Sequence, residues 1–278
     1  MQMLETLYVS DLDGTLLRQD ATLSDYTCQT INRLVAAGLP FTLATARSVA
    51  SARPAVAGLR LSLPAVMMNG VFLTDLKTEK HAHIAYLKKE DALRVLSTFL
   101  DRGRPPFIYT CRDGAGIDVS FTELRSRYEE DFVAERKTRY RSFAQVADYT
   151  VDEHTVYING IDRPEVILPI FDAVRRLPGV DAVCYPDNYD DRYYFLEAFS
   201  DQAGKWAGIR RLAQMYGFRR VVTIGDNLND MEMLTCADVG VAVENAHPEV
   251  LKIADKVIGA NQADGVARFL LEEAAAVL

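Results

Sequence analysis

The chain reads LYVSDLDGT over residues 7–15, and this stretch predicts a buried strand that ends in a turn bearing two carboxylates. Side chains at alternate positions of a strand share a face, so Asp11 and Asp13 are expected to address one pocket while Leu12 points elsewhere. Gly14 leaves the backbone free for a sharp turn. Paired carboxylates at a strand end predict a site for Mg²⁺ and phosphate, because a hard cation prefers oxygen ligands.

A calcium-binding loop is the alternative for this motif. Such a loop needs further oxygen ligands and a closing Glu at fixed spacing, and Leu16, Leu17 and Arg18 do not supply them. The favoured interpretation is an Asp nucleophile whose target phosphate is neutralised by a cation.

Composition predicts a soluble globular protein without broad affinity for nucleic acid or membranes. The chain has 278 residues, of which 49% are hydrophobic and 25% charged, enough for one large core or two modest ones. A formal charge of -8 argues against nucleic-acid or anionic-membrane partners. The first residues form neither a basic segment nor a long apolar one, so no signal peptide or membrane span is expected. The cysteines contain no C-x-x-C pair, which favours reduced thiols and a cytoplasmic location.

Apolar runs separated by helical patterns predict an α/β fold with a parallel sheet. A helix is expected over residues 23–38, because Ser24 is a suitable N-cap and Gly38 is suited to end the helix. The expected parallel strands, each buried on both faces, cover residues 7–10, 41–45, 65–68, 221–224 and 239–243.

The middle of the chain has a different pattern and predicts an inserted α+β unit. Charged helical stretches over 88–102 and 164–177 alternate with strand-like runs at 107–109, 155–158 and 193–195. We therefore expect a core formed by residues 1–85 and 195–278, with residues 86–194 as the inserted domain.

Polar residues follow four of the predicted strands. In an open α/β sheet, ligands bind outside the carboxyl ends of the strands, so these residues should converge on one rim. Beside Asp11 and Asp13, the rim would carry Thr45-Ala46-Arg47, Asn69-Gly70 and the segment GDNLND at 225–230. Thr45 offers a hydroxyl, and the backbone amide that follows it can cradle phosphate oxygens.

Lys205 lies in the first turn of a predicted helix over 204–216, where its charge opposes the positive end of the helix macrodipole. Two interpretations stay open. Lys205 is either a solvated surface residue or a ligand for a dianionic phosphoryl group.

These motifs, in this order, resemble the four motifs of the haloacid dehalogenase superfamily. The matching segments are Asp11-x-Asp13-Gly-Thr, Thr45-Ala46-Arg47, Lys205, and Gly225-Asp226-x-x-Asn229-Asp230. The tail, with GVAVENAHPEV at 240–250, Ala254-Asp255 and DGVA at 264–267, is similar to the Cof-type phosphatase branch. The resemblance implies a Rossmann-like core with a large α/β cap at the insertion.

The resemblance also implies a role for each motif residue. Asp11 would be the nucleophile that forms an aspartyl-phosphate, and Asp13 would protonate the leaving alcohol and then activate water. Asp230 would orient Lys205. Mg²⁺ would be held by Asp11, by the main-chain carbonyl of Asp13 and by Asp226. The phosphoryl group would be bound by Leu12, Thr45, Ala46, Lys205 and Asn229.

The implied function is a Mg²⁺-dependent phosphatase for small phosphorylated metabolites, such as sugar phosphates, working as a monomer or weak homodimer. One alternative is a phosphotransferase resembling phosphomannomutase, which would require a bisphosphate activator. Another is a non-catalytic, phosphate-responsive binding protein. The intact Asp11 and Asp13 argue against it, because a binder needs neither nucleophile nor acid.

Two positions depart from the family pattern. Relatives often have Gly in place of Ala46, a mild change because the backbone amide remains. They also often have Gly where this chain has Trp206, which could alter access near Lys205 or pack against the core.

Several other conspicuous residues have plainer interpretations. His81 and His83 share a strand face, but they lack further metal ligands nearby and favour a hairpin surface. The charged run at 135–141 favours a solvated face. Tyr189, Tyr193 and Tyr194 either line a substrate pocket or fill the core of the inserted unit, and both options stay open.

Overall fold

The computed structural model describes residues 5–114, 116–187 and 190–275. The chain divides into two compact units. The first comprises the residues up to His83 and those from Gly204 onward, and the second is Ile84–Ala203. In the described part of the chain, no helix is both long enough and apolar enough to cross a membrane.

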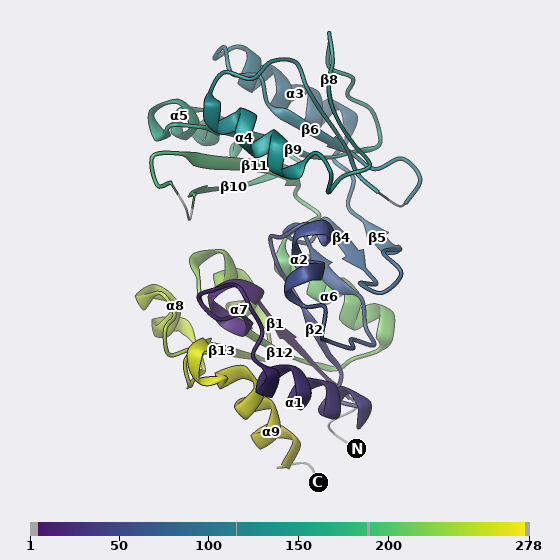
Figure 1. Cartoon of the computed structure of the whole chain (residues 1–278), viewed down its shortest axis with the longest axis vertical. Helices are drawn as coiled ribbons and strands as arrows, with labels where there is room; N and C mark the ends of the chain where they lie inside the picture. The colour runs from purple at the N-terminus through teal and green to yellow at the C-terminus, as the bar shows by residue number, and fades with distance from the viewer. Residues whose placement is uncertain (1–4, 115, 188–189, 276–278) are drawn as a thin grey trace. The chain divides into compact units, whose positions relative to one another are not determined.

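The first unit is built on a five-stranded parallel sheet, in the order β14-β13-β12-β1-β2 (Figure 1). Helices α1 and α9 pack against each other, while α6 contacts α7, which packs on β12 and β13. The predicted fold class is confirmed. The strands are β1 (Thr6–Ser10), β2 (Phe41–Leu43), β12 (Arg220–Gly225), β13 (Val239–Val243) and β14 (Lys256–Ile258). The helices are α1 (Asp25–Ala36), α2 (Val49–Ala55), α6 (Lys205–Tyr216), α7 (Met231–Cys236), α8 (Pro248–Ile253) and α9 (Gly265–Ala275).

Local sequence accounts for the first strand and helix. All five residues of β1 are buried, as expected for a strand with helices on both sides of its sheet. The Ser24 hydroxyl accepts the backbone N–H of Thr27 at 2.9 Å and caps α1, as predicted. Asp264 stabilises the same helix start, because its carboxylate accepts the hydroxyls of Ser24 (2.5 Å) and Thr27 (3.0 Å).

The third predicted strand differs from the expectation. In the described part of the chain, a single parallel bridge, between Ala44 and Val66, joins it to the region after β2. Its other pairing is antiparallel, because Met68, Asn69 and Gly70 all have positive φ and reverse the chain direction. The result is a small separate sheet of β3 (Ala65–Met67), β4 (Phe72–Thr74) and β5 (His81–Ile84).

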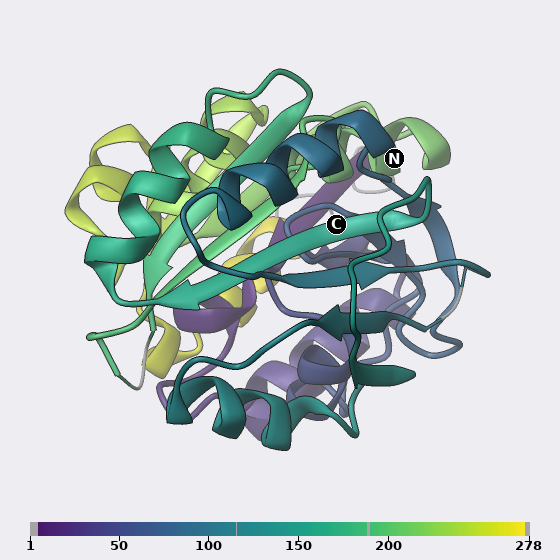
Figure 2. The same cartoon turned by 90° about the horizontal axis from the view of Figure 1, so that it is seen from above.

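The second unit contains a six-stranded sheet in the order β10-β11-β9-β6-β7-β8, antiparallel except between β7 and β8. Helices α3 and α5 lie side by side on this sheet and bury an apolar core against it (Figure 2). The strands are β6 (Phe107–Thr110), β7 (Asp118–Phe121), β8 (Ser142–Gln145), β9 (Thr155–Asp162), β10 (Val180–Pro186) and β11 (Tyr194–Ser200). The helices are α3 (Lys89–Leu100), α4 (Arg127–Arg136) and α5 (Pro164–Val174).

The division of the chain falls at different residues from those expected. Strand β11 pairs with β9 and β10, so residues 195–203 belong to the second unit and not to the first. The aromatic run at 193–195 predicts the last strand of the insertion, and hence a boundary after residue 194. The inter-strand hydrogen bonds of β11 extend six residues further.

A buried ion pair between Arg104 and Glu129 lies in the second unit. Arg104 and Glu129 are 2% and 1% exposed, and the guanidinium lies 2.5 Å from the carboxylate. Arg104 also donates to the carbonyl of Ile161, and its Nε lies 2.8 Å from Asp162. Burial raises the pKa of Glu129, and Arg104 opposes that shift.

We expect Arg104→Leu to destabilise the protein by about 3–5 kcal/mol, because it leaves the Glu129 charge buried and unpaired. Urea unfolding followed by circular dichroism measures this change. The matched control is Arg127→Leu, whose 82% exposed side chain forms only surface pairs and should change stability by about 1 kcal/mol or less. Equal effects of the two substitutions would contradict the prediction.

Candidate active site

A buried cluster of opposite charges forms where β1 meets the start of α6. Lys205 Nζ lies 2.6 Å from Asp11 Oδ1 and 2.6 Å from Asp230 Oδ1. The three side chains are 3%, 8% and 0% exposed, in the order Lys205, Asp11, Asp230. The solvated interpretation of Lys205 is therefore wrong, because its ammonium is enclosed and paired.

Close backbone approach places Lys205 there. The carbonyl of Asn69 accepts the N–H of Gly204 at 2.7 Å, directly before the helix begins. Gly70 has a φ of 85°, and a Cβ on it would lie 2.0 Å from the Gly204 carbonyl oxygen. Only glycine fits at this position. The left-handed turn at residues 68–70 thus docks the start of α6 against the sheet.

The loop after β12 is held by Asp230 and by Thr15. Asp230 Oδ2 accepts the backbone N–H groups of Asp226 (3.0 Å) and Asn227 (3.1 Å). The Thr15 hydroxyl donates to Asp226 Oδ1 at 2.7 Å. Gly14 has a φ of 78°, and a Cβ there would lie 2.3 Å from Asp226 Oδ2, so the turn after β1 packs directly on this carboxylate.

The electrostatics of the cluster are those of crowded carboxylates around one cation. Burial raises the pKa of Asp11 well above its ordinary value; Lys205 opposes this shift, and the charges of Asp230 and Asp226 add to it. Burial also raises the pKa of Asp226 to about 6. For Lys205, burial alone would lower the pKa, but the charges of Asp11 and Asp230 outweigh it and raise that pKa. The single positive charge of Lys205 does not balance the negative charges of three ionised carboxylates.

The donor set fits a hard divalent cation. Carboxylate oxygens of Asp11, Asp226 and Asp230 lie within 4.8 Å of one another. Both oxygens of Asp230 are already engaged, one by Lys205 and one by two backbone N–H groups. Asp11 and Asp226 therefore have the freer oxygens, and a cation between them would favour the ionised form of both carboxylates, against the effect of burial on their pKa values.

Asp13 does not address the same pocket as Asp11 in this structure. Its side chain is 48% exposed and forms a two-pronged pair with Arg47, with Nε to Oδ2 at 2.7 Å and Nη2 to Oδ1 at 2.5 Å. Residues 12–16 form a tight turn instead of continuing the strand, so the alternation expected from β geometry stops at Asp11. Leu12 is fully buried in that turn.

The remaining predicted residues lie at neighbouring strand ends. Thr45 is buried after β2, and its hydroxyl accepts the N–H of Arg47 at 3.1 Å. Ala46 is half-buried, and Asn229 is exposed in the turn Leu228–Asp230. Among the hydrogen bonds and ion pairs of the described residues, none joins these three to the Asp11 cluster. Trp206 is half-buried beside Lys205.

Sequence reasoning missed two contributors to the site. Arg47 belongs to the second motif, and its guanidinium holds Asp13. Asn245 belongs to the 240–250 segment, and its side-chain amide donates to the carbonyl of Gly14 at 2.8 Å, which stabilises the turn. Membership of these two segments is the signal that the sequence offers for both residues.

His81 and His83 are not among the residues of the acidic cluster. His81 bonds to Thr74 through Nδ1 at 2.9 Å, and burial lowers the pKa of both His81 and His83. Within the described ranges, the acidic cluster is the only group of three or more residues suited to a metal.

In the second unit, Arg141 pairs with Asp113 and Asp118, in line with an ion-paired surface for the 135–141 run. Tyr193 stacks on Tyr128, and Tyr194 packs against the core of that unit. Tyr189 lies outside the described residues.

A parallel-sheet core with an acidic cluster at the carboxyl ends of β1 and β12, and a buried lysine at the start of α6, is the arrangement of a hydrolase of the haloacid dehalogenase type. A family model described as haloacid dehalogenase-like hydrolase matches residues 8–270, so the chain belongs to this family. The resemblance noted in the sequence, including its Cof-type branch, is confirmed.

Named relatives extend over nearly the whole chain. The chain is 26% identical over 274 residues to the 5-amino-6-(5-phospho-D-ribitylamino)uracil phosphatase YitU of Bacillus subtilis, covering 96% of each chain. It is 25% identical over 266 residues to the pyridoxal phosphate phosphatase YbhA of Escherichia coli, covering 94% of this chain and 95% of the relative. A solved haloacid dehalogenase-like hydrolase from Bacteroides thetaiotaomicron shares the fold, with a TM-score of 0.75 and 23% identity over 96% of this chain and 98% of the other.

Proposed function

We propose that this chain is a Mg²⁺-dependent phosphatase that hydrolyses small phosphorylated metabolites through an aspartyl-phosphate on Asp11. The observation that carries the proposal is the buried Asp11 carboxylate held at 2.6 Å by Lys205, beside Asp226. A nucleophile fixed beside a cation is what phosphoryl transfer requires, because positioning and charge stabilisation supply most of its catalysis. A cytoplasmic location and a monomeric or weakly dimeric state belong to the same proposal.

The reaction has two displacements, in which Asp11 is first the nucleophile and then the leaving group, while Asp13 is first the acid and then the base. In the first, an Asp11 carboxylate oxygen attacks phosphorus, the ester P–O bond breaks, and Asp13 gives its proton to the leaving alcohol. In the second, Asp13 takes a proton from water, whose oxygen attacks phosphorus and breaks the bond to Asp11. Inorganic phosphate leaves, and both carboxyl groups return to their starting states.

The other motif residues position the phosphoryl group. Lys205 would contact its oxygens from the buried side, while Thr45, Asn229 and the backbone around Leu12 and Ala46 would contact the remaining ones. Mg²⁺, held by Asp11, Asp226 and the Asp13 carbonyl, would neutralise phosphate oxygens that otherwise repel the nucleophile. The second unit would act as a cap that excludes water and contributes selectivity.

The experiment that tests this function is phosphate release from a panel of phosphomonoesters, with Mg²⁺ and after exhaustive chelation. We expect release only with Mg²⁺, and suppression by Ca²⁺, whose larger and looser shell misplaces the nucleophile. Full activity after chelation would contradict the proposed role of Mg²⁺. An isomeric sugar phosphate as sole product, formed only with a bisphosphate activator, would favour the phosphotransferase.

We expect Asp13→Asn to slow adduct formation more for substrates with an alcohol leaving group than for substrates with a phenol leaving group. Adduct formation from an alkyl phosphate should slow about 10²–10⁴-fold, because its alkoxide leaves poorly without a proton donor. An aryl phosphate needs little protonation, so its first step should slow much less. Rapid-quench burst kinetics are required, since Asp13 also serves the second step. Equal slowing of both substrates would show that Asp13 is not the acid.

A further inference from the structure

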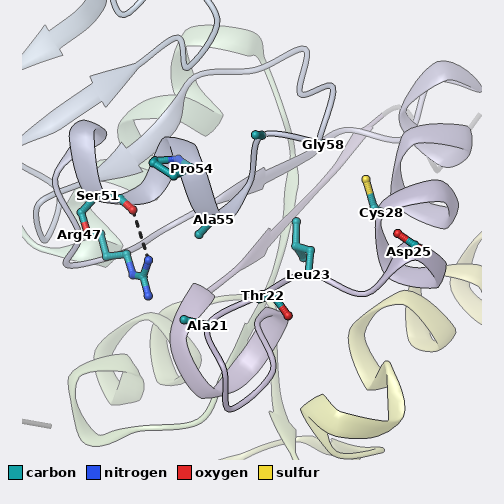
Figure 3. A pocket seen from close by; sticks show the side chains of 11 residues that line it. Ala21, Thr22, Leu23, Asp25, Cys28, Arg47, Ser51, Pro54, Ala55 and Gly58 are labelled. Carbon is teal, nitrogen blue, oxygen red and sulfur yellow. Dashed lines mark hydrogen bonds between the residues drawn. The ribbon is translucent and has the colours of Figure 1, made fainter. Parts of the chain in front are cut away.

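A groove in the first unit lies directly beside the residue that holds Asp13. It encloses about 550 Å³, within the range of small-molecule sites. One wall is α2 with the segment after it, and the other is the 21–23 loop with the start of α1 (Figure 3). Arg47 lines the groove, and its guanidinium joins Asp13 to the carbonyl of Ser51, at 3.3 Å, on the α2 wall.

The side chains that line the groove are small and mostly apolar. Leu23, Pro54 and Ala55 supply apolar surface, and polar groups lie at Ser51 and Asp25. The two walls approach each other at one end of the groove, where a Cβ on Gly58 would lie 2.6 Å from Cys28 Sγ. A groove with this lining would accommodate a largely apolar group of the size of a ring that carries a polar substituent.

We infer that this groove receives the alcohol part of the substrate, and that Arg47 connects it to the reacting centre. The inference rests on the proposed function. Asp13 must touch the leaving oxygen to protonate it, and Arg47, which holds the Asp13 carboxylate, lines the groove. The group attached to that oxygen therefore begins beside Arg47, and the groove is the adjacent space of matching size. Part of the leaving-group selectivity then resides in the first unit.

The first test fills the groove. Ala55→Phe should raise the KM for 1-naphthyl phosphate about tenfold relative to the KM for acetyl phosphate, whose leaving group is too small to enter. Ala36→Phe, on the exposed surface of α1, is the matched control and should leave that ratio unchanged. A ratio that stays within about twofold in Ala55→Phe would overturn the inference and assign selectivity to the second unit.

The second test needs no turnover and so can fail independently of the proposed function. Asp11→Asn is incubated with 1-naphthyl phosphate and then with iodoacetamide, and peptide mass spectrometry measures alkylation of Cys28, in the groove, and of the exposed Cys236. We expect alkylation of Cys28 to slow about tenfold at a ligand concentration ten times the dissociation constant, with Cys236 unaffected. Absence of protection, or equal protection by inorganic phosphate alone, would overturn the inference.

Discussion

Asp11→Asn should reduce phosphate release by about 10⁴-fold or more, because it removes the nucleophile while keeping nearly the same shape. No acid-stable, base-labile phosphoryl adduct should form. Lys205 keeps its partner Asp230 at 2.6 Å, so the fold should remain intact. Acid quenching of the protein after mixing with ³²P-labelled substrate measures the adduct directly, and a urea unfolding curve close to the wild-type one shows that the loss is chemical.

The matched control for this change is Asp172→Asn, since Asp172 lies on the exposed surface of α5 and forms a surface pair with Arg175. Its turnover should equal that of the wild type. If Asp11→Asn retained near-native turnover or still formed the adduct, the nucleophile would have to be another group.

Lys205→Met should lower both stability and activity. It leaves Asp11 and Asp230 enclosed without their counter-charge, and breaking such a buried pair typically costs about 3–5 kcal/mol. The variant should also lose about 10²–10³-fold in kcat/KM, because a fixed cation no longer faces the phosphoryl oxygens. Unfolding should be measured in urea with chelator present, since a bound cation would partly replace the ammonium.

The control for Lys205 is Lys252→Met on α8. The Lys252 side chain is 67% exposed and pairs at 2.5 Å with Glu249, a surface contact worth at most about 1 kcal/mol. Similar small effects from the two lysine substitutions would mean that the ion pairs of Lys205 with Asp11 and Asp230 contribute neither to stability nor to catalysis.

The sequence was sufficient for those features that depend on neighbouring residues. The apolar run before Asp11 predicts β1, and Ser24 predicts the start of α1, because strand periodicity and helix capping act over a few residues. The alternation of strands and helices predicts the parallel sheet for the same reason. The motifs then place acidic residues and a lysine on one rim, since parallel strands present their carboxyl ends at the same edge.

Contacts between distant parts of the chain could not be obtained in this way. The choice between a solvated and a buried Lys205 depended on a partner 194 positions away in the sequence, which helix patterns do not encode. The third strand turned back because residues 68–70 adopt positive φ, and no periodic pattern signals that reversal. The extent of β11 depended on hydrogen bonds to β9 and β10.

The sequence by itself determined the family, the order of the elements and the residue types available for phosphate chemistry, because motif spacing and hydrophobic period are local properties. Tertiary structure alone decided the different surroundings of the two carboxylates of the first motif. Asp11 ends a strand and faces Lys205, whereas the turn that follows carries Asp13 outward to Arg47. The physical reason is that a carboxylate pairs with whichever cation the fold brings within about 3–4 Å, and that proximity is set by chain folding in three dimensions.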